Sequence, residues 1–102
     1  MINVIVSYTV KPAFVAENQE NIREFLEDFR SLDTSTFSYR VFLNSDNVTF
    51  THVSNYRDEQ VQREVLNVPS FLAFQKKRDD SGLEGSHQVQ VLQHIGSTHD
   101  GL

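Results

Sequence analysis

The sequence predicts an α+β fold in which helices cover one face of a four-stranded antiparallel sheet. Three observations carry this prediction. Two strand-like runs flank a turn near the middle of the chain, an amphipathic helical pattern lies on either side of this pair, and a further strand-like run stands near each end. The order of elements is therefore β-α-β-β-α-β, which small domains with a single sheet adopt.

The first strand and the first helix follow from two different periods in the N-terminal third of the chain. Residues 3–10 alternate with the period of two that a half-buried strand requires, and Val or Tyr stands at every second position. Pro12 ends this strand and suits the first turn of a helix, which we expect to run from about Phe14 to Ser31. Its apolar side chains recur at helical spacing, namely Ile22, Phe25, Leu26, Phe29 and Leu32.

A hairpin follows a polar connector at residues 33–36. Phe37–Leu43 and Val48–Ser54 alternate in the manner of strands and are rich in aromatic and β-branched residues. The segment between them, residues 44–47, reads NSDN. Asn and Asp tolerate a left-handed backbone and hydrogen-bond to their own main chain, so we expect this segment to reverse the chain.

The second helical region is expected in two pieces. Asp58 is a suitable N-cap for the first piece. Pro69 interrupts the pattern and starts a second piece that ends at about Arg78. The basic cluster at residues 76–78 is predicted to be a solvated helix end, where cations meet the negative end of the helix dipole.

The last strand is expected over Gln88–Ile95. A loop at residues 80–86 precedes it and a polar tail at residues 96–102 follows it. A chain of 102 residues is long enough for one modest core. We therefore expect a single domain over residues 1–102, with its core between about residues 3 and 95.

Composition narrows the classes of function. The formal net charge is −5 and the pI is about 5.2, and an acidic chain without a basic stripe argues against a nucleic-acid partner. The absence of cysteine excludes disulfides, thiolate metal sites and a cysteine nucleophile. No apolar run approaches the roughly 20 residues that a membrane span needs, and no secretory signal is recognisable. We therefore expect a cytoplasmic protein without membrane contact.

The predicted sheet has two faces that both carry apolar residues. The face expected under the helices holds Val4, Val6, Tyr8, Phe37, Tyr39, Val41, Val48, Phe50, Val89, Val91 and Ile95. The opposite face mixes Ile, Phe, Val and Leu with uncharged Thr, Ser and Gln, and Arg40 is its one formal charge. A face open to water would carry more Lys, Glu and Asp. We therefore expect this face to pack on its copy in a two-fold homodimer.

Several runs also carry a family resemblance. The run FSYRVF at residues 37–42, the hairpin, the aromatic Tyr56 and the run VPSFLAF at residues 68–74 resemble the antibiotic biosynthesis monooxygenase family of dimeric α/β barrels. In that family a SYRVF-like strand follows the first helix, and a SPHFxxF-like segment ends the second. The resemblance covers roughly Asn3 to Ile95. It implies a ferredoxin-like fold with one antiparallel four-stranded sheet, dimerisation through the sheets, and oxidation of a small molecule without a cofactor.

The chain departs from the family pattern at several positions. Family enzymes often carry a tryptophan after the third strand, where Tyr56 stands here, and helix histidines that align with Val65 and Ser70. The haem-degrading branch uses an asparagine that matches about Ile5, together with a tryptophan and a histidine, and none of the three is in place. Haem breakdown is therefore not expected. The glycine usual before the second strand is also missing from residues 33–36.

His52 is the strongest single candidate for chemistry. It lies among apolar neighbours on the strand face that is expected to meet the helices, where a neutral imidazole can act as a base toward a phenol or enol. The alternative is a core or edge histidine that is satisfied by one hydrogen bond, which is the commoner situation.

Aromatic residues are the candidates for binding a small apolar or aromatic molecule. Tyr39 and Tyr56 would clamp an aromatic substrate and donate hydrogen bonds to its oxygen, although buried tyrosines more often contribute packing area alone. Phe71 and Phe74 either line an apolar pocket or fill the core beneath the helices. A cavity beside them would favour the first interpretation.

No metal site and no cofactor are predicted. His87 and His94 are an odd number of residues apart on the last strand and so point to opposite faces, and with His99 they form no convergent set of ligands. Arg40 either fixes a substrate anion or pairs with an acid across the dimer interface, because a buried cation needs a partner.

By resemblance, the most favoured function is a small oxidoreductase of the cofactor-independent monooxygenase type that acts on a quinol- or phenol-like molecule. His52 would be the base, and Tyr39 and Tyr56 would position the ring. Two alternatives stay open. One is a dimer that binds a small apolar molecule or has a structural role without chemistry, which the missing tryptophan and helix histidines favour. The other is an isomerase of a small carbonyl compound that uses the same base.

Overall fold

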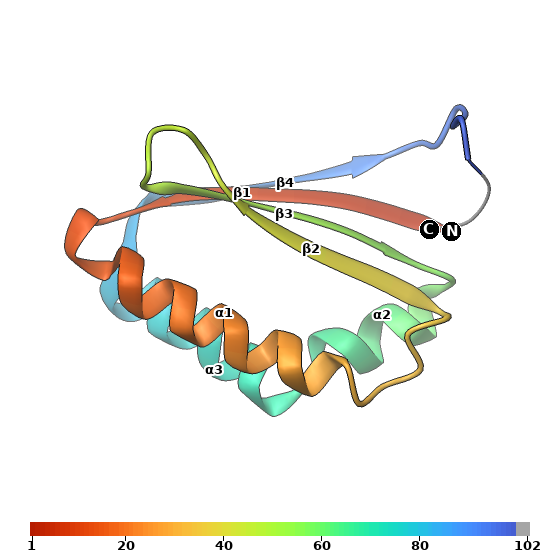
Figure 1. Cartoon of the computed structure of the whole chain (residues 1–102), viewed down its shortest axis with the longest axis horizontal. Coiled ribbons are helices and arrows are strands. Elements are labelled where there is room, and N and C mark those ends of the chain that lie inside the picture. The colour runs from red at the N-terminus through yellow and green to blue at the C-terminus, as the bar shows by residue number, and fades with distance from the viewer. Residues whose placement is uncertain (100–102) are drawn as a thin grey trace.

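Residues 1–99, the part of the chain that the computed structural model describes, form one four-stranded antiparallel sheet with its helices on a single face (Figure 1). The strands lie side by side in the order β2-β3-β1-β4. The predicted α+β class and the β-α-β-β-α-β order are confirmed. Along the chain the elements are β1 (Ile2–Val10), the short turn η1 (Pro12–Phe14), α1 (Val15–Phe29), β2 (Phe37–Leu43), β3 (Thr49–Tyr56), α2 (Glu59–Leu66), α3 (Pro69–Lys77), the turn η2 (Arg78–Gly82) and β4 (Leu83–Leu92).

Local sequence sets the boundaries of α2 and α3. The Asp58 carboxylate accepts a hydrogen bond from the backbone N–H of Val61 at 2.9 Å, which confirms the predicted N-cap. Val68 has an extended backbone, which the following proline favours. This residue therefore prevents α2 and α3 from forming one continuous helix. Pro69 then occupies the first turn of α3, where its missing N–H has no cost. The two-piece helix is therefore a direct consequence of the sequence.

The turn of the central hairpin forms as predicted. Asn47 has a φ of 64°, in the left-handed region that Asn tolerates. The Asp46 carboxylate accepts hydrogen bonds from the backbone N–H groups of Val48 and Thr49 at 3.0 and 2.9 Å, and from the Thr49 hydroxyl at 2.6 Å. The turn thus supplies from its own side chains the partners that its main chain needs.

The last strand differs from the prediction. It begins at Leu83 and ends at Leu92, whereas Gln88–Ile95 was expected and residues 80–86 were expected to form a loop. The two glycines that predict the loop have other roles. Gly82 lies against the Phe14 ring so closely that a Cβ would overlap it, and Gly85, with a φ of 80°, stands where the pairing of β1 with β4 shifts register. Glycine permits both arrangements because it lacks a Cβ.

The strand β4 also lies beyond the cover of the helices. Val89, Val91 and Ile95 were expected under the helical layer, yet they are 55%, 73% and 90% exposed. β4 is the edge strand next to β1, and its C-terminal half runs away from α1 and α3 (Figure 1). Ile95 lies past the end of the strand. Of the predicted tail at residues 96–102, residues 96–99 lie outside any helix or strand, and residues 100–102 are outside the described part.

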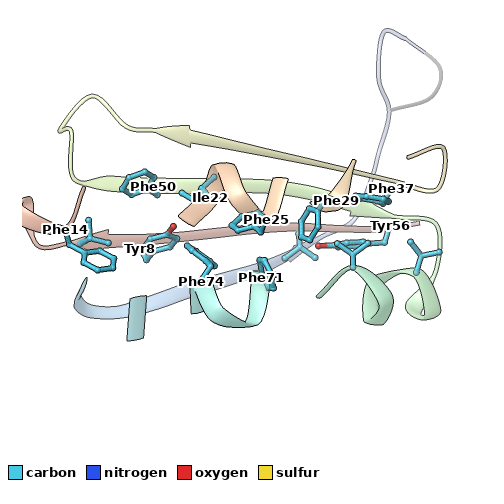
Figure 2. Close-up of a cluster of buried hydrophobic side chains, with 14 residues drawn as sticks. Tyr8, Phe14, Ile22, Phe25, Phe29, Phe37, Phe50, Tyr56, Phe71 and Phe74 are labelled. Carbon is cyan, nitrogen blue, oxygen red and sulfur yellow. The ribbon is translucent and has the colours of Figure 1, made fainter. Parts of the chain in front are cut away.

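Aromatic rings fill the space between the sheet and the helices (Figure 2). Phe25 of α1 is fully buried, and its ring centroid lies 5.0 Å from that of Phe71 and 4.9 Å from that of Phe74, both on α3. Tyr8 of β1 stacks on Phe50 of β3 at 5.7 Å. Each buried ring contributes roughly 1.5–3 kcal/mol to folding, and together the rings form the rigid surroundings of the site.

No helix among the described residues covers the opposite face of the sheet (Figure 1). Ile5 lies opposite Val53 near the centre of this face, which we call the open face. The prediction that Arg40 is its only formal charge is wrong. Because β4 begins at Leu83, Glu84 pairs with Thr9 and joins the open face as a second charge.

Candidate functional site

A cavity of about 180 Å³ lies between the sheet and the helices. Its wall contains all five residues that the sequence singles out as the candidate base and ligand-binding residues: His52, Tyr39, Tyr56, Phe71 and Phe74. A neighbouring, more open hollow of about 300 Å³ shares only Tyr39 with this set. The 180 Å³ cavity is therefore the candidate site.

Strand alternation directs the site residues to the same side of the sheet. Within β3, His52 and Tyr56 are an even number of residues apart and face the helices, as a period of two requires. In the register of the sheet, Val6 and Val41 flank His52, and Tyr39 lies opposite Ser54. The alternation that is visible in the sequence thus suffices to place these side chains under the helices.

A chain of hydrogen bonds runs across the site and includes two residues that were not predicted. The Tyr39 hydroxyl lies 2.7 Å from Nδ1 of His52, and Nε2 of His52 lies 2.8 Å from the Tyr8 hydroxyl. The side-chain amide of Asn18 donates to the Tyr8 hydroxyl at 3.0 Å. Asn18, Tyr8, His52 and Tyr39 therefore form one connected network that spans α1, β1, β3 and β2.

This network occupies both nitrogens of His52. A neutral imidazole has one N–H donor and one bare nitrogen that accepts. One of the two tyrosines therefore accepts a hydrogen bond from His52, and the other donates one to it. His52 reaches a molecule in the cavity through the Tyr39 hydroxyl, because neither of its own nitrogens is free.

Burial sets the protonation of the network. Desolvation, reinforced by the positive charge of Arg78, lowers the pKa of His52 to about 3. Burial also raises the pKa values of Tyr8, Tyr39 and Tyr56. At neutral pH the empty site therefore holds a neutral imidazole between protonated phenols.

The prediction that the basic cluster at residues 76–78 is solvated is wrong for Arg78. Its side chain is only 5% exposed, and its guanidinium lies 5.0 Å from the ring centroid of Tyr8 and 5.4 Å from that of Phe74. Arg78 also lines the cavity. The spacing of the sequence indicates this burial of Arg78, because Phe71, Phe74 and Arg78 are three and four residues apart and so share one helix face. Asn18 carries the same signal, since it stands four residues before Ile22.

The remaining candidates lie elsewhere. Arg40 is exposed on the open face, 5.6 Å from the Phe42 ring centroid. His87 lines the edge of the cavity, and His94 lines a separate hollow with Asn3 and Ile5. Within residues 1–99, no group of three or more His, Asp or Glu side chains lies close enough to hold a metal ion.

The sequence matches one known protein family. The model of the family described as antibiotic biosynthesis monooxygenase matches residues 1–77. The chain belongs to this family. The matched segment runs from β1 to the end of α3 and contains every residue of the hydrogen-bonded network, whereas Arg78 follows it directly.

Solved structures show the same fold at low sequence identity. A crystal structure described as an antibiotic biosynthesis monooxygenase has a TM-score of 0.81 and 15% identity, over 94% of this chain and 100% of the other. The protein Rv0793 of Mycobacterium tuberculosis has a TM-score of 0.81 and 17% identity, over 96% and 98%. The protein PA3566 of Pseudomonas aeruginosa has a TM-score of 0.78 and 17% identity, over 93% and 94%. These likenesses confirm the ferredoxin-like fold.

Two further findings accompany the family match. No curated protein matches the chain, so no relative of established function supplies a substrate. Over residues 1–99, no helix combines the length and the apolar character that crossing a membrane requires.

Proposed function

We propose that this protein is a small oxidoreductase of the cofactor-independent monooxygenase type, and that it acts on a small aromatic molecule of the quinol or phenol class. One observation carries the proposal: an imidazole connects through a tyrosine hydroxyl to an apolar cavity, at 2.7 Å between His52 Nδ1 and Tyr39 Oη. Membership of the antibiotic biosynthesis monooxygenase family supports the reaction class.

The size and walls of the cavity fit a single aromatic ring. An apolar protein cavity of about 150 Å³ holds one benzene molecule, and this cavity measures about 180 Å³. Phe71 and Phe74 supply flat apolar surface, while Tyr39 and Tyr56 supply hydroxyl groups. In the proposal the phenylalanines form an apolar wall against the ring, and the tyrosines orient its oxygen.

His52 acts as the base through Tyr39. With the ring hydrogen of His52 on Nε2 and directed at Tyr8, the bare Nδ1 accepts from Tyr39. The proton of the ligand hydroxyl passes to Tyr39 Oη while the Tyr39 proton passes to Nδ1, which leaves a ligand anion and an imidazolium. The low pKa of His52 in the empty site opposes this step, and a ligand anion beside it favours the charged imidazole again.

The ligand anion then reduces O₂ directly, because its ring is electron-rich. A phenol with an open ring position and O₂ give a quinone and water. One oxygen atom becomes the new carbonyl oxygen and the other leaves as water, and all four electrons come from the ligand. No additional reductant is needed.

We also propose that two copies pack together through the open face. Phe42 is 49% exposed there and Leu92 is 44% exposed, and Ile5 and Val53 form its half-buried centre. Among the strand residues that the structure describes, the open face carries only the charges of Arg40 and Glu84, on the two edge strands β2 and β4. An uncovered sheet face of this composition fits self-association better than hydration.

Oxygen consumption in the presence of a panel of quinols and phenols tests the activity. Wild-type protein should consume O₂ in proportion to its concentration, and His52→Gln should lower the rate by about 100-fold or more. Glutamine keeps one donor and one acceptor for the two tyrosines but takes up no proton. His94→Gln, at an exposed histidine outside the cavity, is the matched control and should retain the rate.

The proposal fails if wild-type protein consumes no O₂ with any member of the panel, or if His52→Gln keeps the wild-type rate. Tyr39→Phe breaks the same relay. Its effect should therefore not add to that of His52→Gln in the double variant.

A second function deserves the same experiment. A dimer that binds a small apolar molecule without chemistry is favoured by one feature of the site, the engagement of both His52 nitrogens in hydrogen bonds. Such a protein would bind members of the panel with measurable affinity and consume no O₂.

A further inference from the structure

Arg78 is a buried cation in the wall of the cavity, which is lined mainly by apolar and aromatic side chains, together with His52, Ser54, Gln62, Gln75 and His87. The whole residue is 4% exposed. Its guanidinium lies over both the Tyr8 and the Phe74 ring, 5.0 and 5.4 Å from their centroids. The cavity that it lines also contains His52 and Tyr39. The other four side-chain ion pairs of residues 1–99 lie at the surface, where the cation is 65% or more exposed.

The protein leaves most of this guanidinium unpaired. Within residues 1–99, Arg78 makes one side-chain hydrogen bond, from Nε to Oδ1 of Asp79 at 2.9 Å. The Asp79 side chain is 49% exposed, so water shares its carboxylate. The two terminal nitrogens carry four further N–H donors in a planar fork, and no side chain of the described residues accepts from them.

A buried guanidinium with one of its five N–H donors paired favours a ligand with negative charge. Removing a cation from water is costly unless an anion or several acceptors compensate. The planar fork of arginine matches two oxygens of a carboxylate, or one oxygen that carries the charge of a phenolate. Burial, and after it the positive charge of Arg78, lowers the pKa of His52 in the wall of the same cavity.

We propose that Arg78 is the anion-binding residue of this cavity, and that its ligand is a one-ring aromatic molecule whose oxygen is ionised when bound. The inference deepens the proposed function, since it rests on the same cavity. To the proposed function it adds that the bound ligand is negatively charged, and that Arg78, the residue directly after the family match, binds this charge. Tyr39 then donates to the same oxygen or to a second oxygen on the ring.

Binding of a matched pair of aromatic probes tests the charge preference. Benzoate and benzamide have nearly the same shape and differ in charge. An opposite charge within about 4–6 Å shifts an ionisation equilibrium by about one to three pH units, so wild-type protein should bind benzoate at least about tenfold more tightly. Arg78→Met keeps the apolar stem against Tyr8 and Phe74 and should lose this preference while it still binds benzamide. Lys77→Met, at the exposed neighbour, should retain it.

A reporter phenol provides an independent measurement. The absorbance of 4-nitrophenol distinguishes its ionised form from its neutral form. Because burial raises the pKa of a phenol in either protein, the pKa of the bound 4-nitrophenol should be about one to three pH units lower in wild-type protein than in Arg78→Met. Arg78→Lys keeps the charge but loses the fork, and it should retain this shift while binding benzoate more weakly.

The outcomes separate this inference from the proposed function. Equal affinity for benzoate and benzamide, or an unchanged preference in Arg78→Met, overturns the role of Arg78 and leaves the cavity as a site for neutral rings. Equal pKa values of 4-nitrophenol bound to wild-type protein and to Arg78→Met also overturn it. Binding of none of the three probes overturns the inference together with the one-ring cavity of the proposed function.

Discussion

Acidification should destabilise this protein through a single buried histidine. The pKa of His52 is about 3 in the folded chain, against 6.5 for the free side chain, because burial and the charge of Arg78 both disfavour the imidazolium. The unfolded chain therefore binds a proton at a pH where the folded chain does not. The stability that the neutral ring provides is fully present above pH 6.5 and is lost as the pH falls toward 3.

The magnitude follows from the two pKa values. Each pH unit between them is worth about 1.4 kcal/mol, so the free energy of unfolding should fall by roughly 1 kcal/mol between pH 7.5 and 5.5 on account of His52 alone. By pH 4.5 the loss should reach roughly 3 kcal/mol. The complete span would remove roughly 5 kcal/mol, a large part of the stability of a small domain.

Urea unfolding at pH 7.5, 6.5 and 5.5 measures this loss. In this range the lowered pKa values of Asp33, Asp46 and Asp58 keep those carboxylates ionised, so they do not contribute to the slope. His52→Gln should remove the His52 contribution and flatten the pH dependence by roughly 1 kcal/mol over this range. His94→Gln, whose ring is exposed, should keep the wild-type slope. Identical slopes for wild type and His52→Gln would show that His52 is not held neutral by burial.

Two further predictions concern assembly and local structure. Phe42→Asp should convert the proposed dimer to a monomer of 11.8 kDa in light scattering, whereas Leu72→Asp, at a similarly exposed residue on α3, should leave the mass unchanged; a wild-type monomer at micromolar concentration would contradict the packing of open faces. Asp58→Ala should lower the free energy of unfolding by about 1 kcal/mol, because α2 loses its N-cap bond to Val61. Asp58→Asn retains an acceptor and should recover most of this loss, and equal losses in both variants would contradict the capping role.

Features that depend on neighbouring residues could be predicted from the sequence. Asp58 and Pro69 mark the starts of α2 and α3 by their own hydrogen-bonding properties. Alternation along β3 places His52 and Tyr56 on the helix side of the sheet without reference to any other element. Alternation along β2 places Tyr39 on the same side, and the three-residue spacing of Phe71 and Phe74 places them on one face of α3. All five predicted site residues line one cavity.

Features that depend on the packing of distant segments could not be predicted. Tyr8 and His52 are 44 residues apart, and their hydrogen bond forms only because β1 and β3 are adjacent in the sheet. Asn18 joins them because the packing of α1 on the sheet brings its side-chain amide within hydrogen-bonding distance of the Tyr8 hydroxyl. Composition suggested that Arg78 is solvated, whereas the turn η2 after α3 brings it under Tyr8.

The sequence by itself determined the order of the elements, their caps and turns, and the side of the sheet that each strand residue faces, because these follow from backbone geometry over a few residues. Tertiary structure alone decided that the helices stop short of β4, that His52 has no free nitrogen and that a buried cation borders the cavity. These depend on how far each helix reaches over the sheet and on the register of the strands. Both result from the packing of the whole aromatic core rather than from any local pattern.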